Sequence, residues 1–307
     1  MIAIQEKYRA VQRGKYKKLF EVVISSSLMA IATFILFNSS ASTDRSKECR
    51  VLREKLMPSI RDFQKVTSFS CSHASTSENS MSVISYSLYG ADPRYISGAL
   101  INAALYREIF KGWKMRVYHD DTVPTDILDA LLEANVELVD MSGIDMNPMN
   151  WRFLAASDPS IDRMCSRDID SRLTFREYHA VTEWSQTTFK VHIIRDHPSH
   201  VEQRCAMPGG MWCVQGGILA NMDDLIDAYN KDTHFNADQE FLQERVWPII
   251  KDEALQHVSF SCETHTNVRK MLPRVGMEHV GAVYLDGELR ETDVKLLRDA
   301  ISNAEDC

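Results

Sequence analysis

The chain has 307 residues, of which 44% are hydrophobic and 25% are charged, an ordinary composition for a globular protein. Its formal net charge is −8 at pH 7, although residues 1–18 hold six basic side chains and one acidic one, which leaves −13 for the remainder. Binding to a nucleic-acid backbone needs a basic face, so the acidic body of this chain argues against a nucleic-acid partner.

A mostly apolar stretch, LFEVVISSSLMAIATFILF, occupies residues 19–37. At about 1.5 Å per residue a helix of this length spans roughly 28 Å, close to the thickness of the hydrocarbon core of a bilayer. The stretch predicts a single transmembrane signal anchor, with a cleaved signal peptide or a buried core helix as alternatives. The basic residues before it favour a cytosolic N-terminus. These features predict a type II membrane protein of the secretory pathway, in the Golgi or the ER.

Residues 38–80 are polar and end in the serine-rich stretch SFSCSHASTSENS, which predicts a stem between the anchor and a body at 81–307. The chain has seven cysteines. An oxidising lumen would permit disulfides, and the odd number leaves at least one cysteine unpaired. The spacing of cysteines and histidines does not match a structural zinc site.

From residue 81 the sequence alternates between strand and helix patterns. Strands are expected at 81–90, 113–121, 136–141 and 160–166, and helices at 93–110, 124–136 and 150–157. This alternation predicts an α/β protein with a Rossmann-type, mixed but mostly parallel sheet flanked by helices. In such sheets ligands bind outside the carboxyl ends of the strands.

The stretch CSRDIDSR places Asp168 and Asp170 at the end of the fourth expected strand. Two carboxylates with this spacing can hold one cation, and oxygen ligands suit Mg²⁺, Mn²⁺ or Ca²⁺, which often also bind a ligand's phosphates. The alternative is a surface turn in which the two acids form ion pairs with Arg167 and Arg172.

The order of these segments resembles the GT-A-type nucleotide-sugar glycosyltransferases over roughly residues 81–285. VISYSLYG resembles their nucleotide-binding first strand, and RVYHDD and VPTDILDALL resemble the units that follow it. NWRFL precedes the acid pair as in glycogenin-like members, MPGGMWCVQGG resembles the glycine-bearing acceptor-side segment, and NADQEFLQERVWPII resembles the Asp-Gln segment that starts a late helix. The RDxDSR, RDHP and GGMW motifs are also similar to those of uncharacterised sugar-transferase-like proteins, in which glycine is expected where this chain has Cys213.

The resemblance implies a metal-dependent glycosyltransferase (a hexosyl- or pentosyltransferase). It would move a sugar from a nucleotide-diphosphate sugar to a glycan or glycoprotein acceptor, with Mn²⁺ or Mg²⁺ as cofactor and this D-x-D motif as the metal clamp. The implied metal ligands are Asp168, Asp170 and His257. The implied donor-binding residues are Tyr86, Arg152, Arg167, Gly209 and Gly210 together with the acid pair, and the implied catalytic carboxylates are Asp196 and Asp238.

Several of these residues also fit ordinary structural roles. His257 fits a core histidine, and His265 competes with it as a ligand. Trp212 fits either a sugar-stacking or a core position, and Asp238 fits either the sugar donor or the N-cap of a helix.

The segment HIIRDHPSH is dense in histidine and aspartate. Asp196, His197 and His200 together would suit zinc, but Pro198 interrupts any helix between them. This favours a strand at 190–196 that carries Asp196 into the site as a base or as a contact to the acceptor sugar. Two other functions remain open: a non-catalytic, lectin-like or structural type II membrane protein, and a metal-dependent phosphoesterase that uses Asp168, Asp196 and His197.

Overall fold

The structure is a computed structural model, and it describes residues 81–201, 205–229, 234 and 236–303. By its internal contacts the chain divides into residues 1–79 and Ser80–Cys307, and the second unit contains all of the described residues. The expected anchor and stem lie outside them. Within the described part of the chain, no helix combines the length and apolar character needed to cross a membrane.

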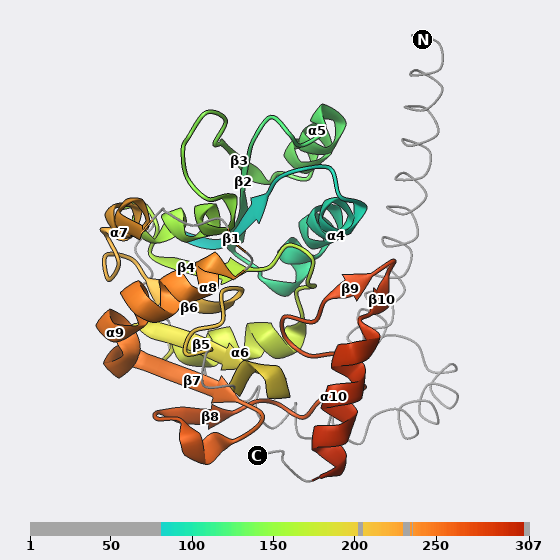
Figure 1. The fold of residues 1–307 in the computed structure, drawn as a ribbon, viewed down its shortest axis with the longest axis vertical. Helices are drawn as coiled ribbons and strands as arrows, with labels where there is room; N and C mark the ends of the chain where they lie inside the picture. Colours follow the sequence, from blue (N-terminus) through green and yellow to red (C-terminus); the bar gives the residue numbers. More distant parts are fainter. Residues whose placement is uncertain (1–80, 202–204, 230–233, 235, 304–307) are drawn as a thin grey trace, which may run out of the picture. The chain divides into compact units, whose positions relative to one another are not determined.

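A mixed sheet runs through the described unit (Figure 1). Its strands are β1 (Ser82–Leu88), β2 (Trp113–His119), β3 (Glu137–Asp140), β4 (Arg163–Arg167), β5 (Val191–Arg195), β6 (Met211–Gln215), β7 (Ala254–Val258) and β8 (Val268–Lys270). They lie in the order β3-β2-β1-β4-β6-β5-β7-β8. Strand β6 is antiparallel to β4 and β5, and the other neighbours are parallel. The predicted α/β class is confirmed, and the arrangement fits a GT-A-type fold.

The helices cover both faces of this sheet. They are α4 (Pro93–Ile109), α5 (Thr125–Glu133), α6 (Phe175–Ser185), α7 (Met222–Tyr229), α8 (Ala237–Phe241), α9 (Trp247–Ile250) and α10 (Glu291–Ser302). The 3₁₀ segments are η1 (Pro148–Ala156), η2 (Pro198–Val201), η4 (Lys251–Glu253) and η5 (Cys262–Thr264), and η3 (Leu242–Val246) is π-helical. Strand β9 (Tyr284–Leu285) pairs with β10 (Glu288–Leu289). In Figure 1, α7, α8 and α9 lie on one side, and α4 and α6 lie on the other.

Polar caps start two helices soon after strands that end at the same edge of the sheet. Asp92 accepts a hydrogen bond from the backbone N–H of Arg94 (2.8 Å), with Pro93 in the first turn of α4. Thr174 accepts from the backbone N–H of Glu177 (3.1 Å) at the start of α6. The loops after β1 and β4 are therefore short, which restricts where their side chains can lie.

The main core lies between the sheet and the layer formed by η1, α7 and α8. Trp212 of β6 is fully buried in it, with its ring centroid 5.7 Å from that of Phe153. Trp212 is therefore a core residue, and the sugar-stacking alternative for it is wrong.

Cys213 occupies the middle of β6 and forms a disulfide with Cys165, its register partner on β4. The departure from the expected glycine thus falls within a strand rather than in a turn. The disulfide joins the strand that leads into the acid pair to the strand that follows Gly209 and Gly210.

Candidate active site

The turn after β4 carries the acid pair, and helix α4 fixes its backbone. The side-chain amide of Asn102 is fully buried and donates to the backbone oxygen of Ile169 (3.2 Å), between Asp168 and Asp170. At Gly98 a Cβ atom would lie 2.0 Å from the same backbone oxygen, so only glycine lets α4 approach this closely. The acid pair therefore sits on a constrained turn at the carboxyl edge of the sheet.

Arg152 of η1 joins two acids from distant parts of the sequence. Its Nη1 atom lies 2.7 Å from Oδ1 of Asp168, and its Nη2 atom lies 2.6 Å from Oδ2 of Asp238. The backbone of Arg152 is held by β1, because its N–H donates to Oγ of Ser87 (3.0 Å) and its carbonyl accepts from Oγ of Ser85 (2.6 Å). Strand β1 thus positions the guanidinium that organises the site.

The site has more negatively charged than positively charged side chains. Arg94 lies 3.2 Å from Asp170, so two guanidinium groups face the three carboxylates of Asp168, Asp170 and Asp238. Burial raises the pKa of Asp170, and the charge of Asp168 raises it further. Burial also raises the pKa of Asp238, in spite of Arg152. A bound cation would compensate this excess of negative charge.

A glycine loop closes on the acid pair from the other side. Because β6 is antiparallel to β4, its first residue pairs with the last residue of β4, and the loop before β6 reaches the same edge. A Cβ atom at Gly210 would lie 2.1 Å from Oδ2 of Asp168, and one at Gly209 would lie 2.9 Å from Nη2 of Arg152. The carbonyl of Gly209 accepts from Oγ of Ser166 (2.8 Å). Close contact therefore requires glycine at Gly210, where the backbone N of Asp168 would also lie only 2.8 Å from a Cβ atom, whereas at Gly209 only the ends of side chains would have to shift.

Asp238 and Gln239, on α8, contact this loop as well as Arg152. The side-chain oxygen of Gln239 accepts from the backbone N–H of Gly209 (2.9 Å). The N-cap position of α8 belongs to Asn236. Oδ2 of Asp238 accepts from Arg152, and Oδ1 accepts from the backbone N–H of Gln239 (2.9 Å), so Asp238 contacts both the start of the helix and the site.

The short loop after β1 adds residues that the sequence did not single out. The ring of Tyr89 packs edge-on against Trp151, with centroids 6.1 Å apart, and Tyr89 is 39% exposed. The guanidinium of Arg94 lies 4.3 Å from the ring centroid of Tyr95. Their signal in the sequence is their position, YGADPRY, directly after a buried strand.

Two predicted donor-binding residues are enclosed in the protein, which corrects the prediction. Arg167 is 1% exposed, pairs with Glu177 and donates to the backbone oxygen of Trp212 (3.0 Å). Tyr86 is fully buried, and burial raises the pKa of its hydroxyl well above the usual range. Side chains alternate along a strand, so Tyr86 faces away from Ser85 and its contact with Arg152.

The alternative prediction, a surface turn in which the two acids pair with Arg167 and Arg172, is also wrong. In the described ranges, the ion pairs of Asp168 and Asp170 are those with Arg152 and Arg94. Arg172 instead lies over the ring of a tyrosine in β9, 4.7 Å from its centroid.

His257 is not beside the acid pair, so its assignment as third metal ligand is wrong. It lies on β7, three strands from β4, which corresponds to about 14 Å at the usual strand spacing. Its Nδ1 atom lies 2.8 Å from Nε2 of His192, and its Nε2 atom lies 3.1 Å from Oε2 of Glu183. His265, the competing residue, belongs to the connection between β7 and β8.

Asp196 has a structural role and is not an accessible base, so its prediction as a catalytic carboxylate is also wrong. It is fully buried, and its carboxylate accepts two hydrogen bonds from Arg176 (2.9 and 2.7 Å) and one each from Arg274 (2.8 Å) and Ser259 (2.6 Å). Burial alone would raise the pKa of Asp196, but the two arginines lower it. A general base needs a pKa near the working pH and access to the substrate.

A separate surface cavity of about 540 Å³ lies at the opposite end of β4. Its lining includes Asp158, Arg163 and Gly216, and it does not include the acid pair. This cavity is therefore distinct from the group of residues around Arg152, which is the candidate active site on the strength of its side-chain contacts.

Comparisons with known proteins give matches among solved structures only. No protein-family model and no curated protein matches the chain. Among solved structures, the galactosyltransferase LgtC with donor and acceptor sugar analogues is 12% identical over 58% of this chain and 73% of its own, with a TM-score of 0.41. The mannosyltransferase PcManGT from Pyrobaculum calidifontis, with GDP-Man and Mn²⁺, is 13% identical over 61% of this chain and 55% of its own, with a TM-score of 0.38.

A third solved structure is not a glycosyltransferase by name. The 4-diphosphocytidyl-2C-methyl-D-erythritol synthase from Anaerococcus prevotii is 11% identical over 73% of this chain and 99% of its own, with a TM-score of 0.40. These likenesses concern the fold alone. The chemistry has to come from the side chains of this chain.

Proposed function

We propose that the protein is a metal-dependent glycosyltransferase that moves a sugar, hexosyl or pentosyl, from a nucleotide-diphosphate sugar to a glycan or glycoprotein acceptor. The observation that carries the proposal is the arrangement around Arg152. This residue bridges Asp168 and Asp238, and Gly210 closes against Asp168 at the carboxyl edge of the sheet. Ligands of α/β proteins bind at this edge.

The donor set around the acid pair fits a hard divalent cation. Asp168 and Asp170 offer carboxylate oxygens, and the raised pKa of Asp170 reflects burial and the negative charge of Asp168. Mg²⁺ and Mn²⁺ prefer such oxygen ligands and usually share them with a substrate's phosphates. When bound, the cation supplies charge stabilisation for the departing nucleoside diphosphate.

The protein's own residues then have separate tasks. Arg152 fixes the carboxylates of Asp168 and Asp238, and Arg94 pairs with Asp170. Gly210 leaves room for the carboxylate of Asp168 beside the loop backbone. Asp238, whose pKa burial raises, is the carboxylate that we assign to the reacting sugar.

The experiment uses the purified full chain with a panel of nucleotide sugars. Release of nucleoside diphosphate is measured with Mn²⁺ or Mg²⁺, with and without EDTA. Activity should need the metal and should fall by at least about 10²-fold in Asp170→Asn, because a group that binds the cation is lost. Asp224→Asn removes the same charge from an exposed position on α7 and should leave activity unchanged.

The alternatives give different results. A lectin-like protein would bind a nucleotide sugar without releasing the nucleoside diphosphate, and that result would reject the enzyme proposal. A phosphoesterase that uses Asp196 is disfavoured by the enclosure of that carboxylate between two arginines. Hydrolysis of a simple aryl phosphate that survives in Asp170→Asn would reverse this judgement.

We further propose that the chain is a single-pass type II membrane protein whose body lies in the lumen of the secretory pathway. The cross-strand disulfide between Cys165 and Cys213 supports this, because disulfides persist in oxidising compartments. Protease treatment of sealed microsomes tests it. The body should be protected until detergent is added, and digestion in intact vesicles would contradict the topology.

A further inference from the structure

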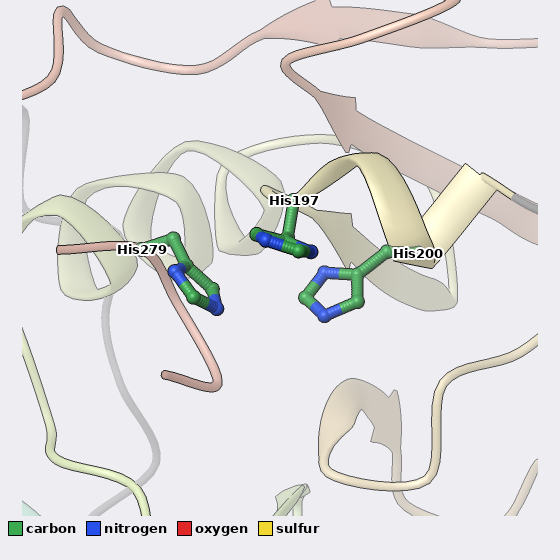
Figure 2. Close-up of side chains that lie close together, drawn as sticks. All are labelled: His197, His200 and His279. Atoms are coloured by element: carbon green, nitrogen blue, oxygen red, sulfur yellow. The ribbon is translucent and has the colours of Figure 1, made fainter. Parts of the chain in front are cut away.

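Three histidines from two separate segments lie together near the carboxyl end of β5. His197 and His200 come from the turn around η2, and His279 comes from the segment before β9 (Figure 2). One nitrogen of each ring lies within 4.8 Å of one nitrogen of each of the others. The ring centroids of His197 and His279 are 4.4 Å apart. These residues are called the histidine cluster below.

The buried carboxylate of Asp196 holds the two segments of the cluster in register. Asp196 directly precedes His197, and its Oδ2 atom accepts from the backbone N–H of Val280 (2.9 Å), which directly follows His279. Arg274 also donates to this carboxylate, from the same segment as His279. The histidine cluster is therefore fixed by a hydrogen-bond network that does not involve the imidazoles themselves.

The cluster also has an outer contact of the kind that supports metal ligands. Nε2 of His197 lies 3.0 Å from the backbone oxygen of Asp293 at the start of α10. A carbonyl only accepts, so this nitrogen carries the proton and Nδ1 carries the lone pair. That Nδ1 atom accepts from the backbone N–H of Ser199 (3.2 Å) and lies 2.7 Å from its Oγ, so a bound metal ion would replace these two contacts. Metal-bound histidines commonly donate their other N–H to a backbone carbonyl in this way.

Two nitrogens of the cluster lack a partner among the residues that the structure describes. They are the buried Nδ1 atoms of His200 and His279. Buried polar atoms nearly always have a partner, so an unpartnered pair in one cluster points to a missing ligand.

We propose that His197, His200 and His279 bind one divalent transition-metal ion of the zinc type. Imidazole nitrogen suits Zn²⁺, and three histidines with a fourth position for water form a known zinc set. Bond lengths of about 2.0–2.1 Å place tetrahedral ligand nitrogens about 3.3 Å apart, which small ring rotations within the 4.8 Å limit can reach. The ion fastens the segment of His279 to the end of β5. This site is independent of the proposed glycosyltransferase activity.

The test measures metal binding by the purified, metal-stripped full chain. After dialysis against Zn²⁺, the wild type should retain one equivalent that His200→Gln and His279→Gln each lose. His234→Gln, at a surface position, should keep it. Asp170→Asn should also keep it, which separates this site from the acid pair. Zn²⁺, but not Mg²⁺, should raise the Tm of the wild type and not that of His279→Gln.

Co²⁺ provides a measurement that needs no variant. Bound to three imidazoles and a water, it should give the intense visible absorption of tetrahedral Co²⁺, which excess Zn²⁺ abolishes. A folded wild type with no such absorption and no retained Zn²⁺ would show that the cluster only packs, and the proposal would be wrong. Loss of the equivalent in Asp170→Asn with retention in His279→Gln would equally overturn it.

Discussion

Replacing Gly210 with alanine tests whether the loop before β6 sets the position of the Asp168 carboxylate. The added Cβ atom would lie 2.1 Å from Oδ2 and 2.3 Å from Cγ of Asp168, and 2.8 Å from the backbone N of the same residue. Atoms in proteins essentially never approach a Cβ atom closer than 3.0 Å, so the carboxylate has to retreat by about 0.9 Å. A displacement of this size breaks the hydrogen bond to Arg152 or moves the carboxylate out of reach of a cation.

The expected losses follow from this displacement. Misplacing a group at a reacting centre by about 1 Å costs on the order of 10²-fold in rate, and overpacking costs about 1–3 kcal/mol in stability. The assays are Mn²⁺-dependent release of nucleoside diphosphate, Mn²⁺ affinity and urea unfolding. Gly210→Ala should lose activity and metal affinity together.

Gly216→Ala is the matched control. Its Cβ atom would lie 2.1 Å from the backbone oxygen of Ile161, an equally severe clash at the other end of β4 and β6. It should therefore lose stability to a similar degree while its remaining folded fraction keeps metal affinity and specific activity. Full activity and unchanged Mn²⁺ affinity in folded Gly210→Ala would refute the assigned role of the loop.

Three further predictions concern stability. The pKa of Asp170 is raised in the folded state, so the contribution of Asp170 to stability should become less favourable as pH rises from the ordinary carboxyl value of 3.8 through the folded-state pKa. Metal-free Asp170→Asn should lack this pH dependence and be the more stable protein at pH 7 in urea unfolding; a less stable variant would contradict the electrostatic reasoning. The pKa of Asp196 is lowered, so its contribution is present above 3.8 and is lost as pH falls through the folded-state pKa. Asp196→Asn should cost about 3–5 kcal/mol at pH 7, because two buried arginines lose their counter-charge. A loss under 1 kcal/mol would show that the arginines are solvated. Replacing Cys165 and Cys213 together with alanine should cost about 2–4 kcal/mol in chemical unfolding. Cys262 is also disulfide-bonded, so reducing agent should destabilise the wild type more than this variant.

Local patterns were sufficient for most of the secondary structure. The expected strand at 113–121 is β2 (Trp113–His119), and the expected helix at 93–110 is α4 (Pro93–Ile109). Apolar periodicity and helix-start residues are properties of a few neighbouring side chains, so the sequence displays them directly. The expected helix at 150–157 is the 3₁₀ helix η1, which begins two residues earlier and spans Pro148–Ala156.

Part of the candidate site was also predictable, through the resemblance to a known family. Asp168, Arg152, Gly209, Gly210 and Asp238 were named together, and the structure brings them into contact. Whether they bind a metal and a donor sugar stays a prediction.

The wrong assignments share a physical cause. Arg167 and Asp196 belong to suitable motifs, but their charges are neutralised by Glu177 on α6 and by arginines from two segments. His257 is separated from the acid pair by the order of the strands, which local sequence does not encode. His279 likewise joins His197 only through tertiary packing, so no spacing rule could have grouped them.

The reversed direction of β6 decides which changes of length the chain can tolerate. The loop before β6 lies beside the acid pair, whereas the loop after β6 lies at the opposite edge of the sheet. An insertion after Gln215 should therefore lengthen a peripheral loop without changing the candidate active site. A deletion of one residue in β6 that shifts the register of Trp212 would move its side chain to the other face of the sheet, out of the core. Among related sequences, loop length should accordingly vary more after β6 than before it.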